Sequence, residues 1–292
     1  GLLLSLEINK IHLLDCLTAM RQLEDNSIDC IITSPPYNKK GLIRGTKKKD
    51  LPALGKLVKT ASEQKTQSSN PELDGKKKTE RYKYHEKGNA IWKNFDIDYS
   101  DYGDNMKEED YHAWMIAFLN ECNRVIKSTG SIFFNHKPRR CKNQAHLPTD
   151  FIVNSEPIIY QVIVWDRKSS PNIRNDVLVP CTERVYWLRK NEKKSKPNVY
   201  RNQLAKEFRG EVWKIIAKKQ KNHPAPFPPQ LVENCILLST QPGDIVLDPF
   251  MGCGTTAIVA NGLSRNWLGF EIDADYIKSY YEEVGAIEEP HE

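Results

Sequence analysis

Short β-branched runs alternate along the chain with stretches whose apolar residues have helical spacing. A strand is expected within residues 5–14, followed by a helix whose apolar residues Leu17, Met20 and Leu23 recur every three positions. The next strand is expected at 28–33. A strand, a helix and a strand within about thirty residues form a βαβ unit, and such units imply a parallel sheet.

The same alternation continues down the chain. Acidic residues at 108–110 begin a long helix that Gly130 is predicted to end. Shorter helices are expected at 229–239 and 257–261, and the ambiguous stretch 139–156 is closest to a poor helix. Further strands are predicted at 131–134, 158–165, 183–188, 244–247 and 267–271. This order of elements is typical of an α/β protein.

The strand at 28–33 runs directly into Ser34, Pro35, Pro36 and Tyr37. A strand that stops at two prolines leads into a rigid loop. Because neither proline has a backbone N–H, their carbonyls are expected to be free acceptors, beside the Ser34 hydroxyl and the Tyr37 ring. Such a loop suits a planar base that carries an exocyclic amino group. An ordinary turn at the end of a strand is the competing interpretation.

A glycine-rich segment follows the predicted strand at 244–247. It consists of Asp248, Pro249, Phe250, Met251, Gly252, Cys253, Gly254, Thr255 and Thr256. Glycines between a strand and a helix let a ligand approach the backbone beside the helix N-terminus. The spacing is not that of the dinucleotide G-x-G-x-x-G, and the lysine of a P-loop is missing. Glu271 closes the next strand about twenty residues later, where an acid can accept both ribose hydroxyls of a nucleoside cofactor.

Charge is distributed unevenly along the 292 residues, whose net charge is +5. Residues 39–92 hold 15 Lys and Arg against 6 Asp and Glu, a local charge of +9, and the remainder carries −4. We interpret this segment as an insertion that is mobile or partly disordered without a partner. Its charge suggests a polyanionic partner, most simply nucleic acid, and a solvated lysine-rich loop is the alternative.

Cysteine and apolar content restrict the setting of the protein. The seven cysteines include no C-x-x-C pair, so neither a zinc site nor a disulfide framework is suggested, and a reducing cytoplasm fits best. No run approaches the roughly 18 to 20 apolar residues of a membrane span. The opening Gly1–Leu4 is too short for a signal peptide.

The order of the two motifs resembles the DNA amino-methyltransferases of restriction–modification systems, in the permuted arrangement called the beta class. In that family an S/D/N-P-P-Y motif comes first, a target-recognition region follows, and D-P-F-x-G-x-G-T-T comes last. The matching segments here are 34–37, 189–222 and 248–256. The resemblance implies one circularly permuted methyltransferase domain over 1–292. Its insertion at 39–92 is longer than the family needs.

The resemblance also implies the fold and the cofactor. The fold would be a doubly wound, mostly parallel seven-stranded sheet with strand order 3-2-1-4-5-7-6, in which strand 7 is antiparallel. S-adenosyl-L-methionine would be bound by Asp15, His223, Phe227, Asp248, Pro249, Phe250, Gly252, Gly254, Thr255, Thr256 and Glu271. Among these, Glu271 would bind the ribose, Asp15 the adenine, and His223 and Phe227 would line the methionine pocket. A helix cap for Asp15 and a turn residue for His223 are the competing roles.

For the reaction, the resemblance implies that the target base leaves the duplex, because its amino group is otherwise paired. Ser34 Oγ and the Pro35 carbonyl would accept hydrogen bonds from that amino group, and Tyr37 would stack on the base. Methyl transfer would be a direct displacement that depends on positioning, without a covalent intermediate. Serine at the first position of the loop favours N4 of cytosine, and N6 of adenine is the alternative.

Three other interpretations compete with this one. A C5-cytosine enzyme would need a nucleophilic cysteine, and Cys181 lacks the supporting acidic motif. An RNA or protein methyltransferase usually places the cofactor motif first, and a non-catalytic DNA-binding subunit would carry a decayed site. The expected partners are double-stranded DNA and, in a restriction–modification system, a cognate endonuclease. The expected location is the bacterial cytoplasm, at the nucleoid.

Overall fold

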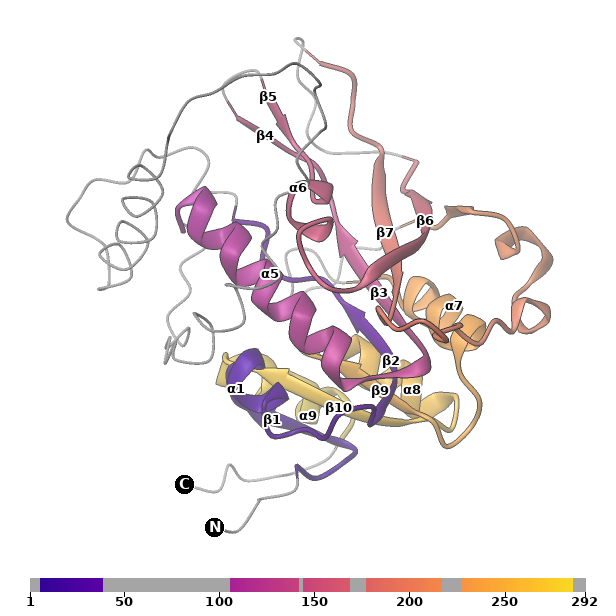
Figure 1. Cartoon of the computed structure of the whole chain (residues 1–292). Helices are drawn as coiled ribbons and strands as arrows, with labels where there is room; N and C mark the ends of the chain where they lie inside the picture. The colour runs from indigo at the N-terminus through magenta and orange to yellow at the C-terminus, as the bar shows by residue number, and fades with distance from the viewer. Residues whose placement is uncertain (1–5, 39–105, 142–143, 169–176, 217–226, 286–292) are drawn as a thin grey trace.

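The computed structural model describes residues 6–38, 106–141, 144–168, 177–216 and 227–285 (Figure 1). The lysine-rich insertion at 39–92 and His223 therefore lie outside the described residues. No helix within the described ranges is long and apolar enough to cross a membrane.

A single large sheet runs through the described chain, in the order β1-β10-β9-β2-β3-β7-β6-β8. Its strands are β1 Lys10–Leu13, β2 Ile28–Thr33, β3 Ile126–His136, β6 Ile158–Asp166, β7 Thr182–Arg189, β8 Val212–Lys214, β9 Ile245–Asp248 and β10 Asn266–Glu271. β7 is antiparallel to both of its neighbours, and every other pair is parallel. If β9, β10, β1, β2, β3, β6 and β7 are numbered 1 to 7, the first seven strands of the sheet have the expected order 3-2-1-4-5-7-6.

The eighth strand, β8, was not predicted. It extends the sheet at the β6 edge, where Trp165 is the register partner of Trp213. Its residues belong to a short apolar run, 212–217, inside a longer polar and basic stretch, and no strand was expected there. Trp213 itself is 1% exposed, so one anchoring side chain holds the strand in place. The mostly parallel α/β fold is confirmed. The expected number of seven strands was wrong, because β8 makes the sheet eight-stranded.

Helices cover both faces of the sheet (Figure 1). One face carries α1 Cys16–Met20, α5 Glu108–Val125 and α6 Thr149–Ile152, and the other carries α7 Pro229–Ser239, α8 Thr255–Gly262 and α9 Ala274–Glu283. Two short 3₁₀ helices, η1 Arg201–Gln203 and η2 Lys206–Phe208, precede β8.

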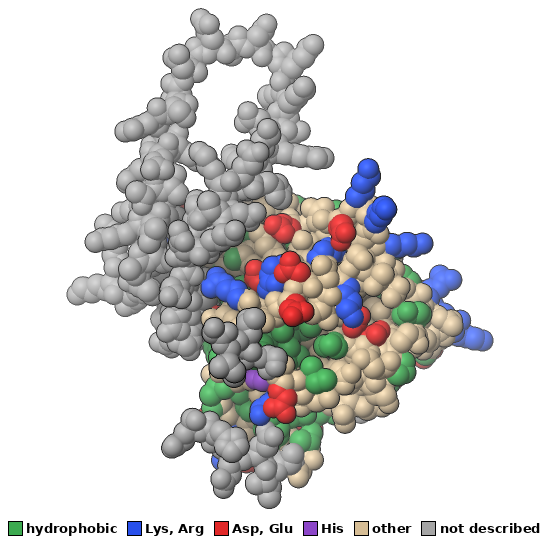
Figure 2. Space-filling view, turned by 60° about the horizontal axis from the view of Figure 1, so that its bottom comes forward, with side chains coloured by type: hydrophobic (Ala, Val, Ile, Leu, Met, Phe, Trp, Pro, Cys, Tyr) green, Lys and Arg blue, Asp and Glu red, His purple; other side chains and the backbone are tan. Residues whose placement is uncertain are grey.

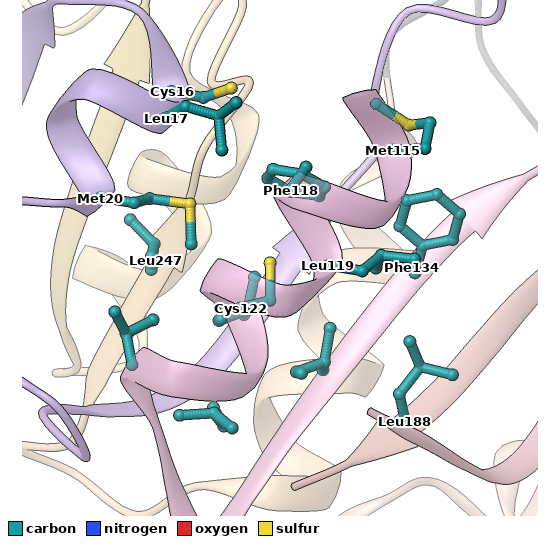
Figure 3. Packing of buried hydrophobic residues seen from close by; sticks show 14 of the residues in the cluster. Cys16, Leu17, Met20, Met115, Phe118, Leu119, Cys122, Phe134, Leu188 and Leu247 are labelled. Atoms are coloured by element: carbon teal, nitrogen blue, oxygen red, sulfur yellow. The ribbon is translucent and has the colours of Figure 1, made fainter. Parts of the chain in front are cut away.

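The long helix α5 is held by its apolar stripe. Met115, Phe118, Leu119 and Cys122 recur at helical spacing, and all four are fully buried. Figure 3 shows these side chains between α1 and Leu247 of β9 on one side and Phe134 of β3 and Leu188 of β7 on the other. Burial of each large apolar side chain contributes roughly 1.5 to 3 kcal/mol, so the stripe fixes α5 on the sheet.

Two details of this half of the molecule differ from the expectation. α5 ends at Val125 and β3 begins at the next residue, so Gly130 lies inside the strand. A side chain at Gly130 would approach the Asp29 carbonyl and Ile126 to 2.8 Å, which is why glycine is needed there. The stretch predicted as a poor helix instead forms a hairpin, β4 Arg139–Cys141 with β5 Gln144–His146, and then the short α6.

Candidate active site

The two sequence motifs leave the sheet from neighbouring strands. Ile31 of β2 is the register partner of Leu247 of β9, so the Ser34–Tyr37 loop and the turn after Asp248 emerge side by side. Both lie at carboxyl ends of central parallel strands, which is where ligands bind in open α/β sheets. Folding therefore joins two segments more than 200 residues apart in the sequence.

The two proline carbonyls of the loop have different environments. The Pro36 carbonyl lies 2.8 Å from the Tyr111 hydroxyl, so the expectation that both carbonyls are free was wrong. The Pro35 carbonyl has no hydrogen-bond partner within the described ranges. Of the two carbonyls, that of Pro35, a buried residue, is therefore the one without a hydrogen-bond partner among the described residues.

Tyr111 also lies 2.8 Å from Nε2 of the buried His136. Burial lowers the pKa of His136 to about 3, so its ring is neutral near pH 7. Its Nδ1 lies 2.8 Å from the Lys137 carbonyl, to which it can only donate, so Nε2 is left as an acceptor. The single hydroxyl proton of Tyr111 is therefore shared between His136 and the Pro36 carbonyl.

The hydroxyl of Tyr37 is the centre of a second hydrogen-bond network. It lies 2.8 Å from Ser34 Oγ, 2.9 Å from Asn135 Nδ2 and 3.4 Å from Glu183 Oε2. Burial, and then the charge of Glu183, hold the pKa of Tyr37 well above its usual range. The ring stays partly exposed, with the His136 ring 4.6 Å away, so its expected stacking on a base remains a prediction.

The glycine-rich turn is organised around the buried carboxylate of Asp248. Its Oδ2 accepts from Thr256 Oγ1 at 2.6 Å, and its Oδ1 accepts from the Phe250 N–H at 3.1 Å. Burial raises the pKa of Asp248 to about 7. These bonds tie the end of β9 to the first turn of α8 and shape the turn between them.

Glycine is required at Gly254, the residue before α8. Its φ is +83°, and a Cβ there would lie 2.1 Å from Cδ2 of Tyr280. Gly252 also has positive φ, at +54°. The positive φ at both positions calls for glycine, and at the buried Gly254 the space that a side chain would take is filled by the Tyr280 ring, so close approach of a ligand to this backbone remains a prediction.

Glu271 at the end of β10 binds the same turn. Its Oε2 accepts from the Gly252 N–H at 2.7 Å, and its Oε1 accepts from the N–H groups of Ile272 and Asp273 at 2.9 and 3.0 Å. Burial raises the pKa of this carboxyl. Three of its roughly four acceptor positions are thus used by the backbone.

Asp15 follows β1, which pairs with β10 so that Leu13 lies opposite Glu271. Its Oδ1 accepts from the Thr18 N–H at 3.0 Å and so caps α1. Its Oδ2 has only the thiol of Cys16, at 3.9 Å, as a neighbour among the hydrogen bonds of the described chain. Asp15 therefore has the capping role, and its Oδ2 remains as an acceptor for a second role.

Phe227 precedes α7 and is partly buried. It lines a small pocket together with Asn135 of β3 and Ile32 of β2, two residues before Ser34. Pro249, Phe250, Thr255 and Thr256 all lie in or beside the turn, where the ring of Phe250 packs against α5. No cluster of three or more metal-ligating side chains occurs in the described part of the chain.

Sequence reasoning missed the polar residues behind the loop, which are Tyr111, Asn135, His136, Arg167 and Glu183. Asn135 and His136 are polar residues directly after a predicted apolar strand, a signal that could have marked them. Glu183 is the second residue of β7, between Thr182 and Arg184, and nothing local distinguishes it from a surface residue. Only the pairing of β7 with β3 brings it to the site.

The region expected to recognise the target, 189–222, is described up to residue 216. Its first part lies at the amino end of β3, where the N–H groups of Lys196 and Asn198 donate to the carbonyls of Ser128 and Thr129. Its later part, β8, runs beside the carboxyl end of β6. A cavity of about 610 Å³ lies where η1, η2 and β8 face β6 and β7.

Comparison with known proteins places these observations in a family. Residues 28–282 match the model of a family described as DNA methylase, with the name N6_N4_Mtase. The type II methyltransferase M.BglII of Bacillus subtilis is 24% identical over 308 residues, which cover 94% of this chain and 68% of that protein. The DNA adenine methyltransferase YhdJ of Escherichia coli is 28% identical over 199 residues, which cover 59% of this chain and 66% of that protein.

Solved structures share the fold. The PvuII DNA methyltransferase, described as cytosine-N4-specific, has a TM-score of 0.65 at 18% identity, with 97% of this chain and 88% of that chain covered. A Thermus thermophilus protein described as a DNA modification methylase, complexed with S-adenosyl-L-methionine, has a TM-score of 0.58 at 19% identity. Its comparison covers 94% of this chain and 92% of that chain.

Proposed function

Because this chain belongs to the N6/N4 family of DNA methylases, we propose that it transfers a methyl group from S-adenosyl-L-methionine to the exocyclic N4 of cytosine in duplex DNA. One observation carries the proposal. The Ser34–Tyr37 loop and the Asp248–Gly254 turn lie at the carboxyl ends of adjacent strands β2 and β9. A base held by the loop would thus meet a cofactor held by the turn.

The residues of the turn fit the cofactor. Gly252 is partly exposed in the turn, where a ligand could approach its backbone, and Asp248 places a carboxylate at the carboxyl end of β9. When bound, S-adenosylmethionine supplies a methyl group on a positively charged sulfur. Glu271 has about one acceptor position left, so it suits one ribose hydroxyl rather than both. Asp15 Oδ2 is the candidate partner of the adenine, and Phe227 and His223 are proposed at the methionine pocket.

The loop would hold the target base. A base in a duplex cannot reach the loop, so it must first swing out of the stack. Ser34 Oγ and the Pro35 carbonyl then accept hydrogen bonds from the amino group, and the partly exposed ring of Tyr37 offers a face for stacking. Accepting both hydrogens turns the nitrogen lone pair away from the ring and toward the turn. Catalysis then consists mainly of positioning, with no covalent bond to the enzyme.

The choice of cytosine rests on Ser34. Serine at the head of the loop resembles the N4-cytosine enzymes, whereas aspartate or asparagine is usual in the N6-adenine enzymes. The second candidate is N6 of adenine, which is favoured by the similarity to an adenine methyltransferase of Escherichia coli. Cys181 lies before β7, outside both motifs, so a C5-cytosine mechanism has no support here.

Double-stranded DNA is the proposed partner, with 189–222 as the target-recognition region and 39–92 as a source of phosphate contacts. The face seen in Figure 2 mixes acidic side chains with lysines and arginines that gather toward one margin, so that face is not a uniformly basic surface. The proposed location is the bacterial cytoplasm at the nucleoid, and a cognate restriction endonuclease is a further proposed partner.

Cofactor binding and methyl transfer test the proposal separately. Calorimetry should show binding of S-adenosylmethionine by the wild type and by Ser34→Ala, because Ser34 is not part of the turn. Labelled methyl should reach duplex DNA with the wild type and at least about 100-fold more slowly with Ser34→Ala, as for removal of a positioned catalytic group. Cofactor binding without transfer to any DNA would favour a non-catalytic subunit, and transfer unaffected by Ser34→Ala would contradict the role of the loop.

A further inference from the structure

We propose that Glu183 is a positioning residue that fixes the direction of the hydrogen bonds behind the catalytic loop, so that Ser34 Oγ meets the target amino group as an acceptor. The inference rests on the proposed function, because it assigns Glu183 a part in the methylation reaction. It starts from a buried chain of polar groups that runs from Ser34 through Tyr37 and Asn135 to Glu183 and Arg167.

Glu183 is only 6% exposed, and both of its carboxylate oxygens are used. Oε1 accepts from Arg167 at 2.7 Å. Oε2 accepts from Asn135 Nδ2 at 3.0 Å and from the Tyr37 hydroxyl at 3.4 Å. Because Arg167 occupies Oε1, the side of the carboxylate that faces the loop is Oε2. The ion pair with Arg167 thus places an anion directly behind Tyr37.

A count of donors and acceptors decides which atom donates in each hydrogen bond between Glu183 and Ser34. An ionised carboxylate only accepts, so Asn135 must turn its amide NH₂ toward Glu183, and the same NH₂ donates to the Tyr37 oxygen at 2.9 Å. The Tyr37 hydroxyl has one proton, and the anion is its strongest acceptor. With that proton directed at the carboxylate, we assign Ser34 Oγ, 2.8 Å from the Tyr37 oxygen, as the donor of the bond between them.

This direction decides what Ser34 offers to a substrate. A serine hydroxyl has one proton and two acceptor lone pairs. With its proton directed at Tyr37, Ser34 presents only lone pairs to the loop opening. Those lone pairs suit an exocyclic amino group, whose hydrogens need acceptors. If the chain ran the other way, Ser34 would direct its own proton at the amino group and repel it.

Glu183→Gln should reverse the chain without removing atoms from it. Arg167 would take the single amide oxygen of the glutamine, and the amide NH₂ would then face Asn135 and the Tyr37 oxygen. Tyr37 would have lost its anionic acceptor, so its proton would turn to Ser34. Ser34 would in turn direct its proton at the loop opening. The side-chain volume is nearly unchanged, so the reversal is separated from a packing defect.

Steady-state kinetics test this reversal. Glu183→Gln should lower kcat about 10- to 100-fold, the range expected for loss of a hydrogen bond to a charged group, with KM for S-adenosylmethionine unchanged. Tyr37→Phe removes the oxygen through which Glu183 acts, so the double variant should be no slower than Tyr37→Phe alone. Glu24→Gln, at an exposed glutamate outside both motifs and outside 189–222, is the matched control and should leave kcat unchanged. Wild-type kcat in Glu183→Gln, or additive losses in the double variant, would overturn the proposal.

A second measurement needs no activity. In protein labelled with ¹³C at the tyrosine ζ carbons, the Tyr37 signal is identified by its loss in Tyr37→Phe. Burial, and then the charge of Glu183, raise the pKa of Tyr37, so Glu183→Gln should shift the Tyr37 signal and lower the pKa of Tyr37, whereas Glu24→Gln should change neither. An unchanged ionisation would overturn the proposal even if the wild type methylated nothing. A wild type that methylated no DNA would instead contradict the proposed function.

Discussion

At the scale of single residues, the cofactor turn depends on two carboxylates that the backbone already binds. Asp248 accepts from Thr256 and Phe250, and Glu271 accepts from three N–H groups that include Gly252. Both acids were expected from the sequence as direct ligand contacts. Their first role in the structure is to hold the turn in shape, and whatever they offer a ligand is the acceptor capacity that remains.

The pKa of Asp248 makes stability depend on pH. The folded protein keeps this proton to about pH 7, whereas an unfolded aspartate loses it near pH 4. The contribution of Asp248 is therefore complete below about pH 4 and is lost as the pH rises toward 7. Relative to Asp248→Asn, the wild type should lose on the order of 4 kcal/mol of unfolding free energy across that range.

Urea unfolding of both proteins at several pH values from 4 to 8 measures this difference. The stability of the two proteins should diverge as pH rises, with Asp248→Asn relatively more stable at pH 8. A difference that stays constant with pH would show that Asp248 does not hold a proton in the folded state.

Gly254 provides a test of backbone shape at the same turn. Gly254→Ala places a Cβ against the Tyr280 ring at positive φ, so it should reduce stability by about 2 to 4 kcal/mol. Gly262→Ala is the control, because nothing lies within 4 Å of its Cβ and its φ is not in the left-handed region. It should be neutral or stabilise by about 0.5 kcal/mol. Equal unfolding midpoints for the two variants would contradict this description of the turn.

At the scale of elements, a segment expected to recognise DNA begins by supporting the fold. Lys190 follows β7, and its ammonium donates to the carbonyls of Asn123, Arg124 and Ile126 at 2.8 to 3.1 Å. These carbonyls belong to the C-terminal end of α5 and the start of β3, where backbone acceptors lack helical partners. A cation there also interacts favourably with the helix dipole.

Lys190→Met keeps most of the side-chain stem and removes the three hydrogen bonds. We expect a loss of about 1 to 3 kcal/mol in the free energy of unfolding, since hydrogen bonds from a charged donor are lost. Lys193→Met is the matched control, because Lys193 is exposed and its side chain makes no hydrogen bond or ion pair within the described residues. Thermal unfolding of both variants beside the wild type measures the difference. Similar losses in both would contradict the capping role of Lys190.

The elements differ in how far the sequence predicts them. β2 has the predicted bounds, since the β-branched run Ile28–Thr33 ends at prolines that cannot continue a strand. β8 and the two strands of the β4–β5 hairpin were missed because each strand has only three residues and is held by tertiary contacts rather than by a local sequence pattern. The same reason hides Glu183, whose place beside Tyr37 depends on strand pairing between distant segments. The loop and the turn were predictable because proline and glycine act locally.

At the scale of the whole molecule, the chain order and the spatial order of the strands differ. β1 is the first strand of the chain and forms the edge beside β10, which is the last strand. The loop from β2 therefore precedes the turn from β9 in sequence, and the two still occupy adjacent places. The permutation changes the connections between strands and keeps the position of the site.

The basic insertion is the other whole-molecule feature. Its charge of +9 contrasts with −4 for the remainder, so we predict that it contacts DNA phosphates. Deletion of residues 45–85 should weaken DNA binding. It should also reduce the slope of a plot of log affinity against log salt concentration, because fewer counterions are released on binding. Fluorescence anisotropy with a labelled duplex from 50 to about 200 mM salt measures both. An unchanged slope would leave the insertion as a spacer.

The most direct test of the account identifies the methylated nucleoside. The protein is incubated with duplex DNA of mixed sequence and S-adenosylmethionine labelled at the methyl group, and the DNA is then digested to nucleosides and separated by mass. Ser34→Ala, treated in the same way, shows which product depends on the loop. We predict labelled N4-methylcytosine in the wild-type reaction and its loss in the variant. Label found only in N6-methyladenine would contradict the choice of cytosine, and label only in C5-methylcytosine would contradict the assignment of the loop itself.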